Sequence, residues 1–445
     1  MMLKCITQQN ITKISFQGTV RKFSKTQTAN EKHKCELLVV GGGSGGCTMA
    51  AKFASKLGKN KVIIVEPKDV HYYQPMFTLV GGGMKNLSNC GKSMSSVLPS
   101  AAKWIKDEVS QLNPTSNSIV TKQGHQIDYN FMVVAVGLQL NFNKVKGLEE
   151  ALSSDPRVCS NFSPLYVEKT FKALQNFKSG NALFTFPNTP IKCAGAPQKI
   201  MYIADQYLRK VGKRDKANVK YFTSLGVLFG VKKYADALWV ICKNRGLEVN
   251  LRHNLVEVKP KESAAIFENL DKPGETVIQQ YELLHATPPM STPEVLSSCS
   301  ALVDKTGYLE VDKGSLRHVK FPNIFGIGDC TNAPTSKTAA AVAAQSGVLK
   351  KHLRAAMAGK DAPKVAYDGY TSCPLVTGYS SCILAEFDYD GQPLETFPVN
   401  QAKERQSMFL MKKMVMPDLY WHGMLRGYWE GPKIFRKAMH LGMSK

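Results

Sequence analysis

The feature that most constrains this chain is the run CELLVVGGGSGGCTMAAKFA at residues 35–54. Apolar residues 37–40 predict a strand that leads into Gly41-x-Gly43-x-x-Gly46, and a helix-forming stretch follows. A second apolar strand, KVIIVE, ends at Glu66. This spacing is typical of a dinucleotide-binding βαβ unit, in which the glycines let a pyrophosphate approach the helix N-terminus and the acid binds a ribose. A glycine-rich turn in another α/β protein is the alternative.

The charge of the chain is strongly basic and unevenly placed. The 445 residues carry a net charge of +23, and residues 1–34 hold seven Lys or Arg against Glu31 alone. This segment is also rich in Ser, Thr and Gln, which predicts a mitochondrial transit peptide, with a disordered basic tail as the alternative. No nucleic-acid recognition motif accompanies the charge, so no nucleic-acid partner is expected. No stretch reaches the ~18 consecutive apolar residues of a membrane-spanning helix.

The eleven cysteines are scattered, without a CxxC pair or a metal-ligand spacing. We therefore expect no metal site. A structural disulfide framework is not expected in a reducing compartment either. Any disulfide in this chain is therefore expected to be catalytic.

Residues 181–242 repeat the strand–helix–strand rhythm of a second dinucleotide fold. Strands are predicted at 181–187 and 217–224, and helices at 198–209 and 232–244. The loop at 187–195, however, contains no GxGxxG, and the second strand ends in Thr223-Ser224 without a ribose-binding acid. The second domain is therefore predicted to have the topology of a nicotinamide site without its chemistry.

Two later segments resemble parts of FAD-binding folds. The predicted strand at 129–140 contains Ala135-Val136-Gly137, where the chain is expected to leave the first domain. Residues 321–345 predict a strand ending in Gly328-Asp329, followed by an Ala-rich helix from about Lys337. In FAD proteins such an Asp bonds the ribityl chain, and the helix N-terminus faces the flavin pyrimidine. A turn or capping role for Asp329 is the alternative.

The tail interleaves Met and aromatic residues with Lys and Arg. Helical spacing could place Met408, Met411 and Val415 on one face and Lys412 on another. This composition is typical of a helix lying in a membrane interface. A dimer interface or ordinary core packing is the alternative.

Several segments together resemble one family. They are ELLVVGGGSGG, VEPKDVHYYQP, FTFPNTPIKCAGAPQK, TSLGVLFGVKKYADAL, NIFGIGDCTNAPTSKTAAAVAAQ, YDGYTSCPLVTGY and LRGYWEGP. The chain from about residue 35 to 445 resembles mitochondrial sulfide:quinone oxidoreductase, a flavoprotein family related to glutathione reductase. The resemblance implies an FAD enzyme that oxidises hydrogen sulfide, reduces ubiquinone and passes sulfane sulfur to an acceptor such as glutathione. It also implies a peripheral protein of the mitochondrial inner membrane, held there by its C-terminal region.

The resemblance also assigns the site residues. The redox pair falls on Cys193 and Cys373, which eleven cysteines alone would not single out. Lys192 and a helix start are expected to lower the pKa of Cys193. Pro374 is expected to hold Cys373 in an extended turn, where sulfide attacks and leaves a persulfide. The residues implicated in FAD binding are Gly41, Gly43, Ser44, Gly45, Gly46, Glu66, Gln74, Val109, Gly137, Asp329 and Lys337. Quinone is expected near the tail aromatics, where Trp421 and Tyr428 are quinone ligands or lipid anchors.

The expected architecture is an α/β fold of two Rossmann-like domains with a C-terminal amphipathic membrane segment. The predicted divisions are the transit peptide at 1–34, the FAD domain at 35–150 and 300–365, the second domain at 151–299 and the redox-cysteine and quinone region at 366–445. Three competing functions remain: a type II NADH:quinone oxidoreductase, a soluble pyridine-nucleotide disulfide reductase and a non-catalytic flavin scaffold. The missing second GxGxxG argues against an NADH:quinone oxidoreductase. Cys47 has no partner in a CxxxxC pair, which argues against a soluble disulfide reductase. The Cys193 and Cys373 pair argues against a non-catalytic scaffold.

Overall fold

The computed structural model describes residues 31–443, so most of the predicted transit peptide at 1–34 lies outside the described residues. The first strand, β1 (Lys32–Val40), already includes residues 32–34. These residues pair in parallel with residues 126–128. The folded part therefore begins before the predicted boundary at residue 34, because ladder pairing extends the strand toward the N-terminus.

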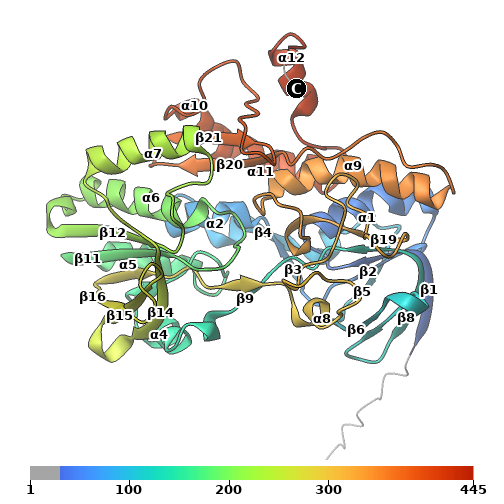
Figure 1. Ribbon diagram of the computed structural model, residues 1–445, viewed down its shortest axis with the longest axis horizontal. Helices are drawn as coiled ribbons and strands as arrows, with labels where there is room; N and C mark the ends of the chain where they lie inside the picture. The colour runs from blue at the N-terminus through green and yellow to red at the C-terminus, as the bar shows by residue number, and fades with distance from the viewer. Residues whose placement is uncertain (1–30, 444–445) are drawn as a thin grey trace, which may run out of the picture.

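The first sheet has seven strands and lies on the right of Figure 1. Its order is β5 (Lys103–Ile105), β2 (Val62–Val65), β1, β8 (Gln126–Val134), β7 (Ser118–Thr121) and β6 (Val109–Asn113), with β19 (Ile324–Gly326) also paired to β8. The pairs of β5, β2, β1, β8 and β19 are parallel. Residues 37–40 are fully buried, as expected for a parallel strand covered on both faces. Helix α1 (Ser44–Leu57) packs on this sheet, and α9 (Ala339–Met357) packs against α1.

The second sheet, on the left of Figure 1, is entirely parallel. Its order is β10 (Val158–Cys159), β17 (Leu283–His285), β11 (Gly180–Phe186), β12 (Ala217–Thr223) and β13 (Glu248–Leu251). Its helices are α5 (Val167–Asn176), α6 (Ala196–Lys210) and α7 (Lys232–Arg245). An antiparallel sheet of β14 (His253–Lys259), β15 (Ala264–Asn269) and β16 (Thr276–Gln280) lies beside it. The predicted βαβ rhythm of residues 181–242 is confirmed.

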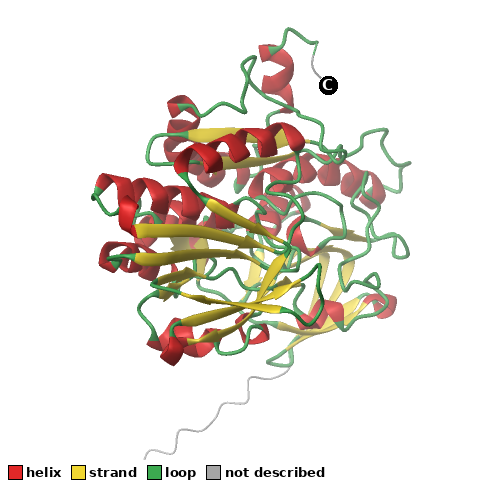
Figure 2. Cartoon of the chain, turned by 60° about the vertical axis from the view of Figure 1, so that its left-hand side comes forward, coloured by secondary structure: helices red, strands yellow, loops and turns green. Residues whose placement is uncertain are grey.

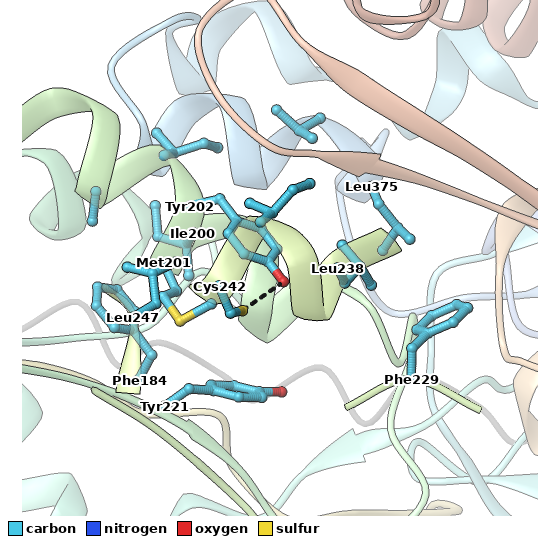
Figure 3. Close-up of a cluster of buried hydrophobic side chains, with 14 of the residues drawn as sticks. Phe184, Ile200, Met201, Tyr202, Tyr221, Phe229, Leu238, Cys242, Leu247 and Leu375 are labelled. Atoms are coloured by element: carbon cyan, nitrogen blue, oxygen red, sulfur yellow. Dashed lines mark hydrogen bonds between the residues drawn. The ribbon is translucent and has the colours of Figure 1, made fainter. Parts of the chain in front are cut away.

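The core of the second sheet extends into the C-terminal region. In Figure 3 the Tyr202 hydroxyl of α6 points to the Cys242 sulfur of α7, at 3.6 Å. Phe184 of β11 and Leu375 of a later hairpin pack in the same cluster. Burial of these large apolar side chains fixes α6 against the hairpin. The loop that precedes α6, residues 187–195, contains Cys193 and is called the cysteine loop below.

The chain crosses between the two sheets through β9 (Gln139–Leu140) and β18 (Met290–Ser291), which pair antiparallel. After the second crossing it returns to the first sheet to form β19 and α9. The two parallel sheets are thus two Rossmann-like units in one α/β protein, as predicted.

The C-terminal region lies along the top of Figure 1 and at the same end in Figure 2. It begins with the hairpin β20 (Thr371–Val376) and β21 (Cys382–Phe387). Helical segments follow: α10 (Gln406–Leu410), the π-helix η8 (Met411–Val415), α11 (Met416–Asp418), the π-helix η9 (Leu419–Met424) and α12 (Lys433–Met439). Short π-helical stretches inside a helix are frequent at functional sites.

The remaining elements are short. The strands are β3 (Val70–Tyr72) and β4 (Gly91–Ser93), and the α-helices are α2 (Phe77–Gly81), α3 (Met94–Val97), α4 (Leu148–Ser154) and α8 (Glu294–Ser297). The 3₁₀ turns are η1 (Gln74–Met76), η2 (Leu87–Cys90), η3 (Pro114–Ser116), η4 (Phe142–Lys144), η5 (Arg214–Lys216), η6 (Pro260–Glu262) and η7 (Gly328–Cys330). Within residues 31–443, none of the helices has the length and hydropathy needed to cross a bilayer.

Candidate active site

Two cysteines from distant parts of the chain meet between the second sheet and the hairpin. The Cys193 and Cys373 sulfurs lie 3.5 Å apart, although 180 positions separate them in sequence. Cys193 lies in the loop between β11 and α6, and Cys373 is in β20 rather than in a turn. Cys373 is buried, and Cys193 is half-buried. The structure therefore brings together the pair that the resemblance assigned.

Close approach of the two cysteines depends on a glycine and a strained backbone. A Cβ built on Gly195 would lie 2.6 Å from the Cys373 sulfur and 2.5 Å from the Leu375 side chain. Cys193 itself has φ of +58°, a left-handed conformation that costs free energy in a non-glycine residue. Its N–H donates to the Lys337 carbonyl oxygen at 2.8 Å, and its carbonyl accepts from the Ala196 N–H. The loop is therefore held in place from both sides.

Lys199 is the cation that contacts this cysteine pair. Its ammonium nitrogen donates to the Cys193 sulfur at 3.3 Å, and its side chain is buried. Although burial lowers the pKa of Lys199, the neighbouring Cys193 and Cys373 thiols raise it above its usual value, so Lys199 stays charged. The side chain of a residue in the first turn of a helix points back toward the N-terminus, which brings Lys199 to the cysteine loop.

The surroundings shift the pKa values of the two thiols in opposite directions. The hydrogen bond from the Cys373 thiol and the charge of Lys199 together hold the pKa of Cys193 well below its usual value, against the effect of burial. The same contact with Cys193, together with burial, raises the pKa of Cys373. Cys193 is therefore the thiolate of the pair, and Cys373 keeps its proton.

Lys192, which was expected to lower the pKa of Cys193, has partners other than the Cys193 thiol. The Lys192 ammonium donates instead to Gln74 Oε1 at 2.6 Å and to the Phe162 carbonyl oxygen at 3.3 Å. Burial lowers the pKa of Lys192 to about 8. Lys192 thereby connects the loop before α6 to Gln74, which the resemblance had assigned to the cofactor.

Lys412 is a second cation that the sequence placed on the wrong face. Its side chain is only 2% exposed, and its ammonium donates to the Pro75 carbonyl oxygen at 2.9 Å and lies 5.6 Å from the Tyr73 ring centre. Burial and the charge of Lys199 lower the pKa of Lys412 to about 8. The charge of Lys412 also helps to lower the pKa of Cys193.

The glycine loop after β1 has the shape that a dinucleotide requires. Gly41 has φ of +99°, and a Cβ there would lie 2.6 Å from the Ala135 carbonyl oxygen. A Cβ on Gly43 meets no atom within 4 Å, so open space lies in front of α1, whose first turn contains Ser44, Gly45 and Gly46. A helix N-terminus that faces open space in this way can accept a pyrophosphate.

The acid and its neighbours lie at the same edge of the sheet. Glu66 follows β2, and its carboxylate accepts from the Gly42 N–H at 2.7 Å and the Lys68 N–H at 2.9 Å. Val109 begins β6 and is buried in the sheet core. An added Cβ on Gly137, after β8, meets no atom within 4 Å. Glu66 and Gly137 therefore follow parallel strands, beside the glycine loop, where such sheets bind ligands.

A narrow depression lies where β19 leads toward α9. It is lined by Asp329 and Lys337, with Thr338 capping α9 through the Ala341 N–H. Burial raises the pKa of Asp329 and lowers that of Lys337. The Lys337 ammonium donates to the Thr331 carbonyl oxygen at 3.0 Å. Because Cys193 N–H binds the Lys337 carbonyl, this depression adjoins the cysteine loop.

The tail contacts the glycine loop through a residue that the sequence did not single out. The Tyr420 hydroxyl lies 2.8 Å from Ser44 Oγ and 2.5 Å from His71 Nε2. His71 Nδ1 lies 2.9 Å from the Gly42 carbonyl oxygen, which can only accept, so Nδ1 carries the proton and Nε2 accepts from Tyr420. Burial lowers the pKa of His71 to about 4, so this imidazole is neutral.

An apolar pocket of about 360 Å³ lies beneath the tail. Its lining is mainly alanine, leucine, methionine and aromatic side chains of α9, the hairpin and the tail. They include Tyr73, Ala343, Leu384, Met411, Met416, Leu419, Tyr420, Met424, Trp429, Phe435 and Met439. Trp421 is buried and Tyr428 is 83% exposed, so of the two residues left open by the sequence only Tyr428 faces outward.

This fold and site define the class of the protein. Residues 35–172 match the model of the pyridine nucleotide-disulphide oxidoreductase family. The structure superposes on the sulfide:quinone oxidoreductase of Aquifex aeolicus with a TM-score of 0.75, over 92% of this chain and 95% of that chain at 18% identity. The chain is therefore a flavin-type oxidoreductase with two Rossmann-like units.

Sequence similarity identifies the family. The mitochondrial sulfide:quinone oxidoreductase of Mus musculus is 57% identical over 93% of this chain and 91% of its own length. The chain belongs to the sulfide:quinone oxidoreductase family. The NDH2 of Plasmodium falciparum, solved in complex with NADH, reaches a TM-score of 0.51 at 14% identity over 68% of this chain and 64% of its own. The competing NADH:quinone hypothesis is thus supported by a shared fold alone.

Proposed function

We propose that this chain oxidises hydrogen sulfide at a Cys193–Cys373 disulfide, passes two electrons through FAD to ubiquinone and works in the mitochondrion. The observation that carries the proposal is the 3.5 Å approach of the two sulfurs with the Lys199 ammonium 3.3 Å from one of them. The mitochondrial location rests on the relatives, which are named as mitochondrial enzymes.

The different acidities of the two thiols give the reaction a direction. Hydrosulfide attacks the Cys373 sulfur of the disulfide, a new sulfur–sulfur bond forms there, and the Cys193–Cys373 bond breaks. Cys373 then carries a persulfide, and Cys193 leaves as a thiolate. In thiol–disulfide exchange the thiol of lower pKa leaves faster. Cys193 is that thiol, and Lys199 and Lys412 stabilise the charge that it gains.

The residues at the edge of the first sheet suit FAD. The open space before α1 suits the pyrophosphate, Glu66 the ribose, and Asp329 and Lys337 the flavin end, next to Cys193. Bound there, FAD would accept two electrons from the sulfur chemistry and release them to a quinone. Gln74, held by Lys192, would face the same space.

The apolar pocket beneath the tail suits the quinone ring. Its lining combines aromatic and methionine side chains with few polar groups, as is usual for small-molecule pockets. Around it the tail exposes apolar side chains, which could enter a membrane surface from which ubiquinone is taken. These are Leu410, Met414, Val415, Tyr428, Ile434, Phe435, Met439, Leu441 and Met443. Lys and Arg between them could meet anionic headgroups.

The outer sulfur of the Cys373 persulfide must leave before the disulfide re-forms. A thiol acceptor, or excess sulfide in its place, would attack this sulfur and depart as a persulfide, leaving Cys373 as a thiol. The Cys193 thiolate and the Cys373 thiol would then re-form the disulfide, and the two electrons released would pass to bound FAD. Glutathione is the acceptor that we propose.

The test is anaerobic stopped-flow spectroscopy of the purified FAD-loaded protein. We expect sulfide to bleach the flavin absorbance rapidly and a soluble ubiquinone analogue to restore it. We expect the C193A and C373A variants to keep their flavin and to lose the bleaching by sulfide. Bleaching by NADH but not by sulfide would overturn the proposal and favour an NADH:quinone oxidoreductase.

A further inference from the structure

Strand β20 has the cysteine pair on one face and the apolar pocket on the other. Successive side chains of a strand point to opposite faces. Cys373 faces Cys193, and the preceding residue, Ser372, lines the apolar pocket. Across the hairpin Ser372 pairs with Glu386, which also lines the pocket, and Cys373 pairs with Ala385. Two adjacent residues of β20 therefore face different sites: Cys373 faces the cysteine pair, and Ser372 faces the apolar pocket.

The Ser372 hydroxyl is a polar group with unused hydrogen-bonding capacity. Ser372 is 7% exposed, and its Oγ has no partner of hydrogen-bond geometry among residues 31–443. The nearby Tyr370 hydroxyl donates its own proton to Glu386 Oε1 at 2.5 Å, so it could only accept from Ser372, and the two hydroxyls do not form a bond of hydrogen-bond geometry. A buried polar group without a partner costs free energy, so such a group in a ligand-sized pocket indicates a missing partner.

The other polar groups of this wall are already engaged. Glu386 accepts from Tyr370, from the N–H and the hydroxyl of Thr396 at 2.8 Å each, and from the Gln401 amide at 2.8 Å. Four donors saturate the acceptor sites of a carboxylate. At this wall of the pocket a ligand therefore meets apolar surface, a saturated carboxylate and the Ser372 hydroxyl, which has no hydrogen-bond partner of its own among residues 31–443.

We propose that the Ser372 hydroxyl donates a hydrogen bond to a carbonyl oxygen of the quinone. The inference rests on the proposed function, because it needs a quinone in this pocket. A quinone has an apolar ring and two carbonyl acceptors, and it carries no donor that would need a partner. Its reduction to quinol takes two electrons, supplied by sulfide oxidation, and two protons. The bond from Ser372 strengthens as negative charge grows on the oxygen.

The first test is a binding titration that does not depend on turnover. Trp429 lines the pocket, so quenching of tryptophan fluorescence reports occupancy when the oxidised, FAD-loaded enzyme is titrated with decylubiquinone in detergent. We expect Ser372→Ala to raise the Kd about fivefold, the size of one net hydrogen bond. Ser372→Thr keeps the hydroxyl and should keep the wild-type Kd.

The matched control is Ser381→Ala on the same hairpin. The Ser381 hydroxyl bonds to Thr377 and Glu404 rather than to the pocket. We expect Ser381→Ala to leave the Kd unchanged. An unchanged Kd in Ser372→Ala, or equal increases in both alanine variants, would overturn the assignment.

The same proteins separate this inference from the proposed function. Wild-type enzyme that neither binds decylubiquinone nor is reoxidised by it after sulfide reduction would contradict the quinone reaction itself. Wild-type binding with no change in Ser372→Ala would contradict only the role of Ser372. Flavin reduction by sulfide should be equal in wild type and Ser372→Ala, because Ser372 faces away from the cysteine pair.

Discussion

The two Rossmann-like units of this chain share a topology but present different chemistry at corresponding edges. In the first unit the loop after β1 is glycine-rich and leaves open space before α1. In the second unit the corresponding loop after β11 carries Cys193, and α6 directs Lys199 back to that cysteine. The fold thus supplies a ligand-binding edge in both units, while the residues of the loop determine whether that edge binds a ligand or carries redox chemistry.

The hairpin β20–β21 brings Cys373 to the second edge, so that this edge can carry a redox pair instead of binding a dinucleotide. Gly195 lets the start of α6 approach Cys373 and Leu375 of β20. The hairpin therefore occupies the region next to the second edge, whereas no atom of residues 31–443 lies within 4 Å of a Cβ built on Gly43.

Removing the redox cysteine of the second edge should have the largest effect. We expect Cys193→Ser to slow flavin reduction by sulfide at least about a thousandfold, because no disulfide with Cys373 can form and no thiolate can leave. FAD content should remain normal. Stopped-flow absorbance measures the rate, and the half-buried Cys299, changed to Ser, is the control. Flavin reduction by sulfide at the wild-type rate in Cys193→Ser would contradict the assignment of the sulfide chemistry to the second edge.

Filling the open space of the first edge should affect cofactor binding alone. Gly43→Val places a side chain in front of α1, and overpacking of about 1–3 kcal/mol would weaken FAD binding about tenfold to a hundredfold. Gly230→Val is the matched change in the second unit, because a Cβ there also meets no atom within 4 Å. We expect Gly230→Val to keep wild-type FAD affinity in a titration of the apoprotein. Equal losses in both variants would contradict the assignment of FAD to the first edge.

The cation of the second edge should control the pH dependence of the reaction. Lys199 helps to hold the pKa of Cys193 low, so Lys199→Met should raise that pKa. The thiolate form is lost as pH falls through the pKa, so the alkaline-favoured rise of activity should move to higher pH in the variant. At pH values below the raised pKa the thiolate fraction falls about tenfold for each pH unit, so the loss of rate should be largest at the acidic end of the profile.

The measurement for Lys199 is the pH profile of alkylation of Cys193 in the reduced protein, together with the pH profile of sulfide oxidation. Lys210→Met, an exposed position of the same helix, is the control. A profile that does not move in Lys199→Met would show that the low pKa of Cys193 has another origin.

The contact between the tail and the first edge should give the smallest effect. Tyr420→Phe removes the hydroxyl that binds Ser44 and His71, and we expect FAD affinity to fall about fivefold, since each net hydrogen bond contributes about 1 kcal/mol. Tyr428→Phe, at an exposed tail position, should change nothing. Equal FAD affinity in the wild type and Tyr420→Phe would show that the tail does not support the cofactor loop.

The sequence could predict the parts of this molecule that local patterns encode. The period of apolar residues and the glycines predicted the strands, the helices and the dinucleotide loop, because these depend on neighbours in sequence. Pairing of Cys193 with Cys373 required a family resemblance, since the contact spans 180 positions.

The parts that sequence reasoning missed are contacts between distant segments. Lys412 was expected on another face than Met408, Met411 and Val415, but it is buried and donates to Pro75, which is 337 positions away. Tyr420 binds His71 over 349 positions. Lys199 could have been found locally, since a helix starting at residue 196 directs its first turn toward the preceding loop. Attention to the adjacent Lys192 led instead to the wrong cation.

The most direct test of the account is to locate the sulfur after sulfide has attacked the disulfide and before any acceptor is present. The oxidised protein is mixed anaerobically with one equivalent of sulfide, alkylated, digested and analysed by mass spectrometry. The account predicts one extra sulfur atom on the peptide that contains Cys373 and an alkylated, sulfur-free Cys193. Extra sulfur on Cys193, on a cysteine outside the pair, or on no cysteine would contradict it.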